Sequence, residues 1–244
     1  MNQDNEDRGV SVILEPSIKK GYVMKGSEIT AQDYAYITRL FAQDEQDLME
    51  AMKERADKQG LPEIMISGEQ AKLLSVLIKI HNPDRCLDIG TLFGFSATIM
   101  ARSMGEVGEV VTVERQPEHL DVAEANFREQ GVDDRITTVL GDATEQIDQF
   151  DERSFDLVMI DADKESYTTY FRKAIELVRG GGLILADNTL YRGKVSVDEL
   201  ADDDPAAPNA RAIRAYNKLA AEHPDTDSTI IPTGDGFTIS RYSG

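Results

Sequence analysis

Five strand-like segments alternate with helix-like segments between residues 85 and 188 of this 244-residue chain. Strands that are apolar on both faces and alternate with helices pair in parallel, with helices covering both faces of the sheet. The sequence therefore predicts an α/β fold with a mostly parallel sheet. The strand-like segments, short and rich in Val, Ile and Leu, are 85–90, 108–114, 135–141, 155–161 and 182–188. The segments with apolar residues at helical spacing are 95–104, 117–130, 143–150 and 167–179.

The two ends of the chain follow other patterns. Near the C-terminus, a predicted helix (209–222) precedes two strand-like runs joined by the turn-forming residues "TGDG". These runs are close enough to pair as an antiparallel hairpin at a sheet edge. The first 80 residues contain no convincing strand, and helices are expected at 30–60, with Thr30 as the cap, and at 67–81.

Acidic residues dominate the charge of the chain. Forty-five Asp and Glu against 26 Lys and Arg give a formal net charge of −19. Such a surface repels nucleic acid and anionic membranes at long range, although a local basic patch can override that repulsion. Some of these acidic residues lie in the segment 198–208, which is expected to be an exposed loop.

The chain carries no sign of export or membrane insertion. No stretch approaches the ~20 apolar residues of a membrane span, and the polar N-terminus resembles neither a secretory signal nor a transit peptide. A single cysteine, Cys86, fits a reducing cytoplasm and is expected to be a small buried apolar residue. The three histidines (His81, His119 and His223) show no metal-ligand spacing and are expected to be structural or surface residues.

A glycine-rich turn follows the first predicted strand. Gly90 and Gly94 in "CLDIGTLFGFSA" give D-x-G-x-x-x-G, which differs from the G-x-G-x-x-G of dinucleotide-binding proteins. The carboxylate of Asp88 would repel a pyrophosphate but attract an ammonium or sulfonium, and Glu114 is placed to accept hydrogen bonds from ribose hydroxyls. Together these residues favour S-adenosylmethionine over NAD. Asp142, at the end of the third strand, either contacts an adenine amino group or caps a helix.

Charged and amide side chains end the fourth and fifth predicted strands. Asp161 closes "FDLVMID", while Asp187 and Asn188 close "GLILADN". Ligands bind beyond the carboxyl ends of parallel strands, and neighbouring strands lie ~4.8 Å apart, so these side chains can share one ion. An all-oxygen ligand set suits Mg²⁺, with Ca²⁺ and Mn²⁺ as alternatives. Each aspartate taken alone is more simply a cap or turn residue. Lys164 is either a base near the cation or a surface lysine.

Four segments resemble the cation-dependent O-methyltransferases, a group that includes the catechol and caffeoyl-coenzyme A enzymes: "LDIGTLFGFSA", "VMIDADKESY", "LADNTLYRGKV" and "IIPTGDGFTISR". The resemblance runs from about residue 25 to the C-terminus, and the pairing of "IDADK" with "DNTL" is highly specific. It implies a Rossmann-like class I methyltransferase fold with seven strands and, usually, a homodimer. We expect residues 1–66 to form a helical cap or substrate lid that does not fold independently. Residues 67–244 are expected to form the catalytic domain that binds S-adenosylmethionine.

The resemblance also implies roles for individual residues. Asp161, Asp187 and Asn188 would hold the cation, and Lys164 would act as the base beside Asp161. The predicted contacts to S-adenosylmethionine are Ile66, Ser67, Asp88, Gly90, Thr91, Ser96, Glu114, Asp142 and Ala143. The predicted substrate contacts are Lys25, Tyr191 and Arg192.

Several positions depart from the usual pattern of that group. Asp88 replaces a glutamate, Ala71 and Lys72 stand where many relatives have glycine and glutamine, and Tyr191 stands where plant members have tryptophan. These departures bear on substrate identity and leave the predicted metal ligands unchanged.

The predicted reaction is methylation of one of two vicinal hydroxyls on a catechol or hydroxycinnamate. The alternative is a hydroxyuridine in transfer RNA, because "HPDTDSTIIPTGDG" resembles that subgroup, although the net charge of −19 opposes it. A third possibility is a binding module that uses the fold without chemistry. The basic side chains available for a nucleic-acid rim are Lys19, Lys20, Lys25, Arg192 and Lys194.

Overall fold

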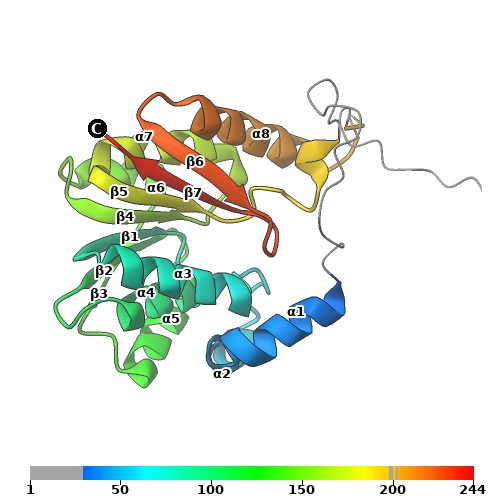
Figure 1. The fold of residues 1–244 in the computed structure, drawn as a ribbon. Coiled ribbons are helices and arrows are strands. Elements are labelled where there is room, and N and C mark those ends of the chain that lie inside the picture. Colours follow the sequence, from blue (N-terminus) through cyan, green and yellow to red (C-terminus); the bar gives the residue numbers. More distant parts are fainter. Residues whose placement is uncertain (1–29, 198–199, 202) are drawn as a thin grey trace, which may run out of the picture.

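The computed structural model describes residues 30–197, 200–201 and 203–244, which form a sheet between two layers of helices (Figure 1). Within these residues, seven strands follow the order β3-β2-β1-β4-β5-β7-β6. The strands are β1 Arg85–Ile89, β2 Glu109–Glu114, β3 Ile136–Leu140, β4 Phe155–Ile160, β5 Val178–Ala186, β6 Thr226–Ile231 and β7 Phe237–Tyr242. Strands β1 to β5 are parallel, whereas β7 runs antiparallel to β5 and β6. The predicted mostly parallel sheet with an antiparallel C-terminal hairpin is confirmed.

The helices alternate with the first five strands, as predicted. The helices are α1 Ala31–Ile37, α2 Gln43–Lys58, α3 Gly68–His81, α4 Phe95–Ser103, α5 Pro117–Gln130, α6 Ala143–Gln146, α7 Tyr167–Leu177 and α8 Ala207–Glu222. The shorter helical turns are η1 Thr38–Ala42, η2 Ile147–Gln149, η3 Lys164–Ser166 and η4 Lys194–Ser196.

Each face of the sheet has its own apolar core. Helices α2 to α5 cover one face, where Leu74 and Phe127 are buried against strand residues such as Leu157. Helices α7 and α8 cover the other face, where Phe171 and Tyr216 are buried and their rings meet edge to face. The prediction of helices on both faces is therefore confirmed. Cys86 is fully buried in the first core, as expected, and burial raises the pKa of its thiol.

The predicted N-terminal helix at 30–60 is interrupted. Thr30 caps it as expected, because its hydroxyl accepts a hydrogen bond from the Asp33 N–H at 3.2 Å. The π-helical turn η1 then separates α1 from α2. Helix α2 packs against α3 and α5, so the N-terminal segment shares the core of the main domain. That this segment does not fold independently, that the protein is a homodimer and that it is cytoplasmic stay predictions. Among the described residues, no helix is long and apolar enough to cross a membrane.

Strand β5 begins earlier than predicted, at Val178 rather than at residue 182, so α7 ends at Leu177. The three glycines at 180–182 lie within the strand, beside a register shift in the pairing of β4 with β5. A Cβ on Gly182 would lie 2.4 Å from Val178 Cγ2 and 2.7 Å from the Asp156 carbonyl oxygen. Glycine therefore permits the close approach that continues the strand.

The C-terminal end of the segment predicted to be an exposed acidic loop, 198–208, is part of a helix. Helix α8 begins at Ala207, so this end of the segment is helical; Ala207 is buried, whereas Pro208 is exposed. Asp203 is exposed, whereas Asp204 is only half-buried and pairs with Lys194. Residues 198, 199 and 202 lie outside the described residues.

Candidate active site

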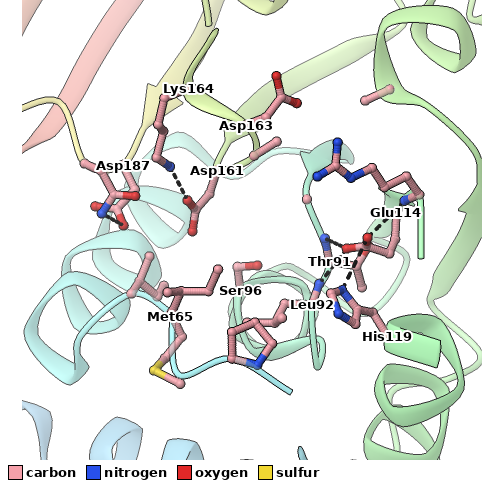
Figure 2. Close-up of a pocket in the computed structure, with 18 of the residues that line it drawn as sticks. Met65, Thr91, Leu92, Ser96, Glu114, His119, Asp161, Asp163, Lys164 and Asp187 are labelled. Atoms are coloured by element: carbon pink, nitrogen blue, oxygen red, sulfur yellow. Dashed lines mark hydrogen bonds and ion pairs between the residues drawn. The ribbon is translucent and has the colours of Figure 1, made fainter. Parts of the chain in front are cut away.

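A cleft of about 910 Å³ lies at the carboxyl ends of the parallel strands. Glu114 and His119 lie on one side of it, while Asp161, Lys164 and Asp187 lie on the other (Figure 2). The predicted residues that line it are Ile66, Gly90, Thr91, Ser96, Glu114, Asp142, Ala143, Asp161, Lys164, Asp187, Asn188, Tyr191 and Arg192. Ser67 and Asp88 do not line it. Lys25 lies outside the described residues.

Glu114 ends β2 and is held by backbone N–H groups. Its Oε2 atom accepts from Thr91 at 3.3 Å and from Leu92 at 3.0 Å. Its Oε1 atom accepts from Arg115 and Gln116, each at 3.0 Å. These four donors fix the carboxylate at the edge of the cleft, where it is 9% exposed. These four bonds use the four lone-pair sites of the carboxylate, so a hydroxyl group that binds Glu114 would share or replace one of the backbone donors.

His119 also lines this end of the cleft, although the sequence indicated a structural or surface histidine. Its Nδ1 atom lies 3.4 Å from Glu114 Oε1. The signal that could have found it is local, because Pro117 begins α5 just beyond the end of β2. The other two histidines are structural as expected. His81 Nε2 lies 3.0 Å from the Asp156 carbonyl oxygen, and the ring of His223 stacks edge to face with Phe171.

The turn after β1 requires glycine at two positions. Gly90 and Gly94 have φ values of +102° and +86°, a region that residues with a Cβ rarely adopt. A Cβ on Gly90 would lie 2.1 Å from the Asp161 carbonyl oxygen, and one on Gly94 would lie 2.3 Å from Phe127 Cε1. The turn therefore lies directly against the end of β4 and against α5.

Asp88 is fully buried beneath this turn. Its Oδ2 atom accepts hydrogen bonds from Ser96 Oγ at 2.9 Å and from Thr112 Oγ1 at 3.1 Å. Within the described part of the chain, its Oδ1 atom has no hydrogen-bond partner. Burial raises the pKa of Asp88 to about 8, against the opposing effect of the two hydroxyl donors. Asp88 thus reaches the cleft through Ser96, and its predicted direct contact with a cofactor stays a prediction.

Asp142 and Ser67 both act as helix caps. Asp142 Oδ1 accepts from the Thr144 N–H at 2.8 Å, which is one of the two interpretations of this residue. Asp142 also lines the cleft, so the predicted adenine contact remains open to test. Ser67 Oγ accepts from the Gln70 N–H at 3.3 Å and begins α3.

Lys164 is held by two partners. Its ammonium donates to Asp161 Oδ1 at 3.1 Å and to Tyr167 Oη at 2.7 Å. The Tyr167 hydroxyl in turn donates to the Asp187 carbonyl oxygen at 3.1 Å. The side chain of Lys164 is only 14% exposed, so the structure contradicts the alternative that it is a surface lysine. Figure 2 shows Lys164 and Asp161 facing each other at the cleft wall.

Asp187 is 1% exposed at the end of β5. The Gln70 side-chain amide donates to its Oδ1 atom, and the Asn188 amide donates to its Oδ2 atom at 2.9 Å. Burial and the nearby charge of Asp161 raise the pKa of Asp187 to about 7, so its ionised form is costly without a cation.

The donor chemistry at this end fits a divalent cation. Among the described residues, no three His, Cys, Asp or Glu side chains gather as a metal-binding cluster. A cation would therefore depend on Asp161, Asp187 and the amide oxygen of Asn188. These oxygen donors are hard ligands, and a cation between the two aspartates would offset their mutual repulsion.

The part of the cleft where substrate contacts are predicted has an unusual backbone. Tyr191 and Arg192 have φ values of +43° and +52°, both in the left-handed region. Tyr191 Oη accepts from Asn209 Nδ2 at 3.0 Å, and the Arg192 N–H donates to Asp235 Oδ1. Asn209 and Asp235 therefore join the two predicted substrate residues in the cleft wall.

Part of the positive charge expected of a nucleic-acid rim is offset within the described residues. Lys194 forms an ion pair with Asp204 at 2.7 Å, which offsets its charge. The other lysines of the predicted rim, Lys19, Lys20 and Lys25, lie outside the described residues.

Sequence reasoning missed two partners of the charged residues. Tyr167, which accepts from Lys164, is three residues further along the chain, a spacing that favours contact within one turn. Gln70 forms part of a capping box with Ser67, which the pattern S-G-E-Q indicates. Its contact with Asp187 joins residues 117 positions apart and has no local signal.

The fold and the cleft together define a class I methyltransferase, the class that uses S-adenosylmethionine. The strand order ends in the antiparallel pair β7 and β6, and the cleft lies at the carboxyl ends of the parallel strands. The O-methyltransferase family matches residues 40–243, and the chain belongs to this family. The predicted resemblance to the catechol and caffeoyl-coenzyme A enzymes is confirmed.

Known relatives and structures agree with this assignment. A catechol O-methyltransferase of Mycobacterium tuberculosis is 40% identical over 76% of this chain and 84% of its own length. A caffeoyl-CoA O-methyltransferase of Medicago sativa is 31% identical over 85% of this chain and 87% of its own length. The crystal structure of an O-methyltransferase from Bacillus cereus in complex with SAH is 30% identical, with a TM-score of 0.76, and the match covers 86% of this chain and 96% of that one.

Proposed function

We propose that this O-methyltransferase methylates one of two vicinal hydroxyls of a catechol or hydroxycinnamate, and that it requires a divalent cation, Mg²⁺ first. The observation that carries the proposal is the placement of the Lys164–Asp161 pair beside the buried Asp187 in one cleft. The relatives named for catechol and caffeoyl-CoA methylation support a small phenolic substrate.

The two ends of the cleft divide the chemistry. Bound S-adenosylmethionine supplies a methyl group on a sulfonium, and a bound divalent cation lowers the pKa of neighbouring substrate hydroxyls. Asp161, Asp187 and Asn188 would hold the cation. Lys164 Nζ accepts the proton of the substrate hydroxyl that is methylated. Asp161 and Tyr167 hold Nζ in place. Lys164 acts as the base in its neutral amine form, because only that form carries a lone pair.

The other end of the cleft binds the cofactor. Glu114 accepts hydrogen bonds from the ribose hydroxyls, and the glycine turn lets the cofactor approach the backbone of Gly90 and Thr91. Ile66 and Ala143 supply apolar walls, and Asp142 accepts from the adenine amino group. A cleft of about 910 Å³ is in the range that accommodates a cofactor and a small substrate together. The protein chiefly positions the two reactants, since the methyl group is already activated.

The first experiment measures methyl transfer from S-adenosylmethionine to 3,4-dihydroxybenzoate and caffeate, with Mg²⁺ and then with EDTA. Methylation that is lost in EDTA and restored by added Mg²⁺ is the expected result. Activity that survives EDTA would overturn the proposed requirement for a divalent cation. Binding of S-adenosylmethionine without turnover of either phenol would overturn the substrate class and direct the assay to transfer RNA.

A variant of Asp187 tests the same site independently. Asp187→Asn keeps the shape of the side chain but removes one charge from the cation site, so turnover should fall by more than about 100-fold, the upper range for loss of an outer-shell partner. The matched control is Asp227→Asn on β6, where the carboxylate is exposed and remote from the cleft. Equal turnover in the two variants would contradict the proposed ligand set.

A further inference from the structure

Gln70 connects three separate elements at the end of the cleft that contains Asp161, Asp187 and Asn188, the proposed cation end. It lies in the first turn of α3 and is 3% exposed. Its Oε1 atom accepts from the Ser67 N–H at 2.9 Å. Its Nε2 atom donates to Asp187 Oδ1, at the end of β5, and lies 3.5 Å from the Thr233 carbonyl oxygen, in the turn between β6 and β7.

These partners allow only one orientation of the amide. The Ser67 N–H can only donate, and an ionised Asp187 carboxylate can only accept. Rotating the amide by half a turn would place its oxygen against the carboxylate and its NH₂ group against the N–H. The capping box of α3 therefore fixes the direction in which Gln70 donates.

The turn between β6 and β7 packs against the other side of the same amide. Gly234 has a φ of +55°, and a Cβ built on it would lie 2.6 Å from Gln70 Oε1 and 3.0 Å from Nε2. No side chain separates the turn from the amide. Gln70 is thus enclosed between the α3 cap and this turn, so the amide has little freedom to move away from Asp187.

The fixed position of the Gln70 amide restricts the orientation of the Asp187 carboxylate. Gln70 holds Oδ1 and Asn188 holds Oδ2, so the orientation of the carboxylate is set from both sides. Each carboxylate oxygen accepts more than one bond, which leaves both free to face a cation. We propose that Gln70 is a positioning residue that holds the Asp187 carboxylate in its cation-binding orientation. This inference rests on the proposed function, in which Asp187 is a cation ligand.

The test compares Gln70→Leu with Gln43→Leu. Gln43 is a matched control, because its amide also donates to an aspartate, Asp47 Oδ1 at 2.7 Å, but on the exposed side of α2. Mn²⁺ binding is measured by electron paramagnetic resonance, and S-adenosylhomocysteine binding by calorimetry. In Gln70→Leu the Mn²⁺ dissociation constant should rise about 10- to 100-fold, the usual cost of losing an outer-shell partner, with S-adenosylhomocysteine affinity retained. Gln43→Leu should leave both affinities unchanged.

The outcomes separate this inference from the proposed function. Mn²⁺ binding in Gln70→Leu equal to that of the unaltered protein overturns the role of Gln70 alone. Absence of Mn²⁺ binding by the unaltered protein overturns the proposed cation, and the role of Gln70 with it. If Gln70→Leu does not fold, Gly234→Ala replaces it, because the new Cβ displaces the Gln70 amide from the other side. Weaker Mn²⁺ binding in Gly234→Ala supports the inference, and unchanged binding overturns it.

Discussion

The two ends of the cleft hold their carboxylates in different ways. At the cofactor end, Glu114 is fixed by four N–H groups of the backbone. At the cation end, Asp187 is fixed by two side-chain amides, those of Gln70 and Asn188, and Lys164 is held by Asp161 and Tyr167. Backbone donors persist when side chains change, whereas side-chain donors do not. Side-chain substitutions should therefore disturb the cation end most, and the cofactor end should respond chiefly to changes in backbone geometry.

The largest effect is expected from Lys164→Met, which keeps the length of the side chain and removes the base. Turnover should fall by about 100- to 10,000-fold, the usual contribution of a general base, while S-adenosylhomocysteine affinity stays unchanged. The measurements are steady-state kinetics and calorimetry. Loss of cofactor affinity in this variant would contradict the independence of the two ends of the cleft.

The control for that variant is Lys173→Met on α7. Lys173 is also half-buried and forms an ion pair with an aspartate, the exposed Asp148, but it does not line the cleft. Its replacement should leave turnover unchanged, because Lys173 does not line the cleft.

A smaller effect is expected from Gly94→Ala, which changes the backbone at the cofactor end. The new Cβ meets the Phe127 ring at 2.3 Å, and alanine at a φ of +86° is strained. Strain of about 1–2 kcal/mol adds to overpacking of about 1–3 kcal/mol, which should lower the free energy of unfolding. Affinity for S-adenosylhomocysteine should also fall, while Mn²⁺ affinity should not.

Gly131→Ala is the matched control for that change. Gly131 has a φ of +65°, but among the described residues no atom beyond its chain neighbours lies within 4 Å of the position that a Cβ would take, so it tests backbone strain without overpacking. Urea unfolding should show a smaller loss of stability than in Gly94→Ala. Equal losses would show that the contact with Phe127 adds nothing.

The smallest effect concerns Asp88, beneath the cofactor end. Burial raises its pKa from 3.8 to about 8, so the folded protein holds a proton there that the unfolded chain releases. The resulting stabilisation is complete below pH ~4 and is lost as the pH rises through about 8. Asp88→Asn removes this titration, so the stability difference should shift in favour of the variant as the pH rises. A difference that is constant with pH, measured by thermal unfolding without cofactor, would contradict the raised pKa.

Most of the sheet and the ends of its strands could be predicted because their signals are local. Apolar runs that end in Asp161 or in Asp187 and Asn188 identify both the strand and the edge of the sheet where ligands bind. The start of β5 was missed, because the glycines at 180–182 suggest a break when the close approach of Val178 to Gly182 is unknown.

The supporting residues of the site were harder to predict. The contact between Gln70 and Asp187 depends on how α3 packs beside β5 and the turn between β6 and β7, and local sequence patterns do not specify such packing. The role of His119 could not be predicted, because the three histidines show no metal-ligand spacing. His119 lies beside Glu114 because α5 begins just after the end of β2.

The left-handed backbone at Tyr191 and Arg192 also limits how this enzyme can be re-engineered. Both residues line the cleft, so under the proposed function they are targets for altering which phenols are accepted. A β-branched residue is a severe outlier at positive φ, whereas Asn, Asp and Gly tolerate it. Libraries that allow Asn, Asp, His and Gly at these two positions, and omit Val, Ile and Thr, should retain more folded members than fully randomised ones.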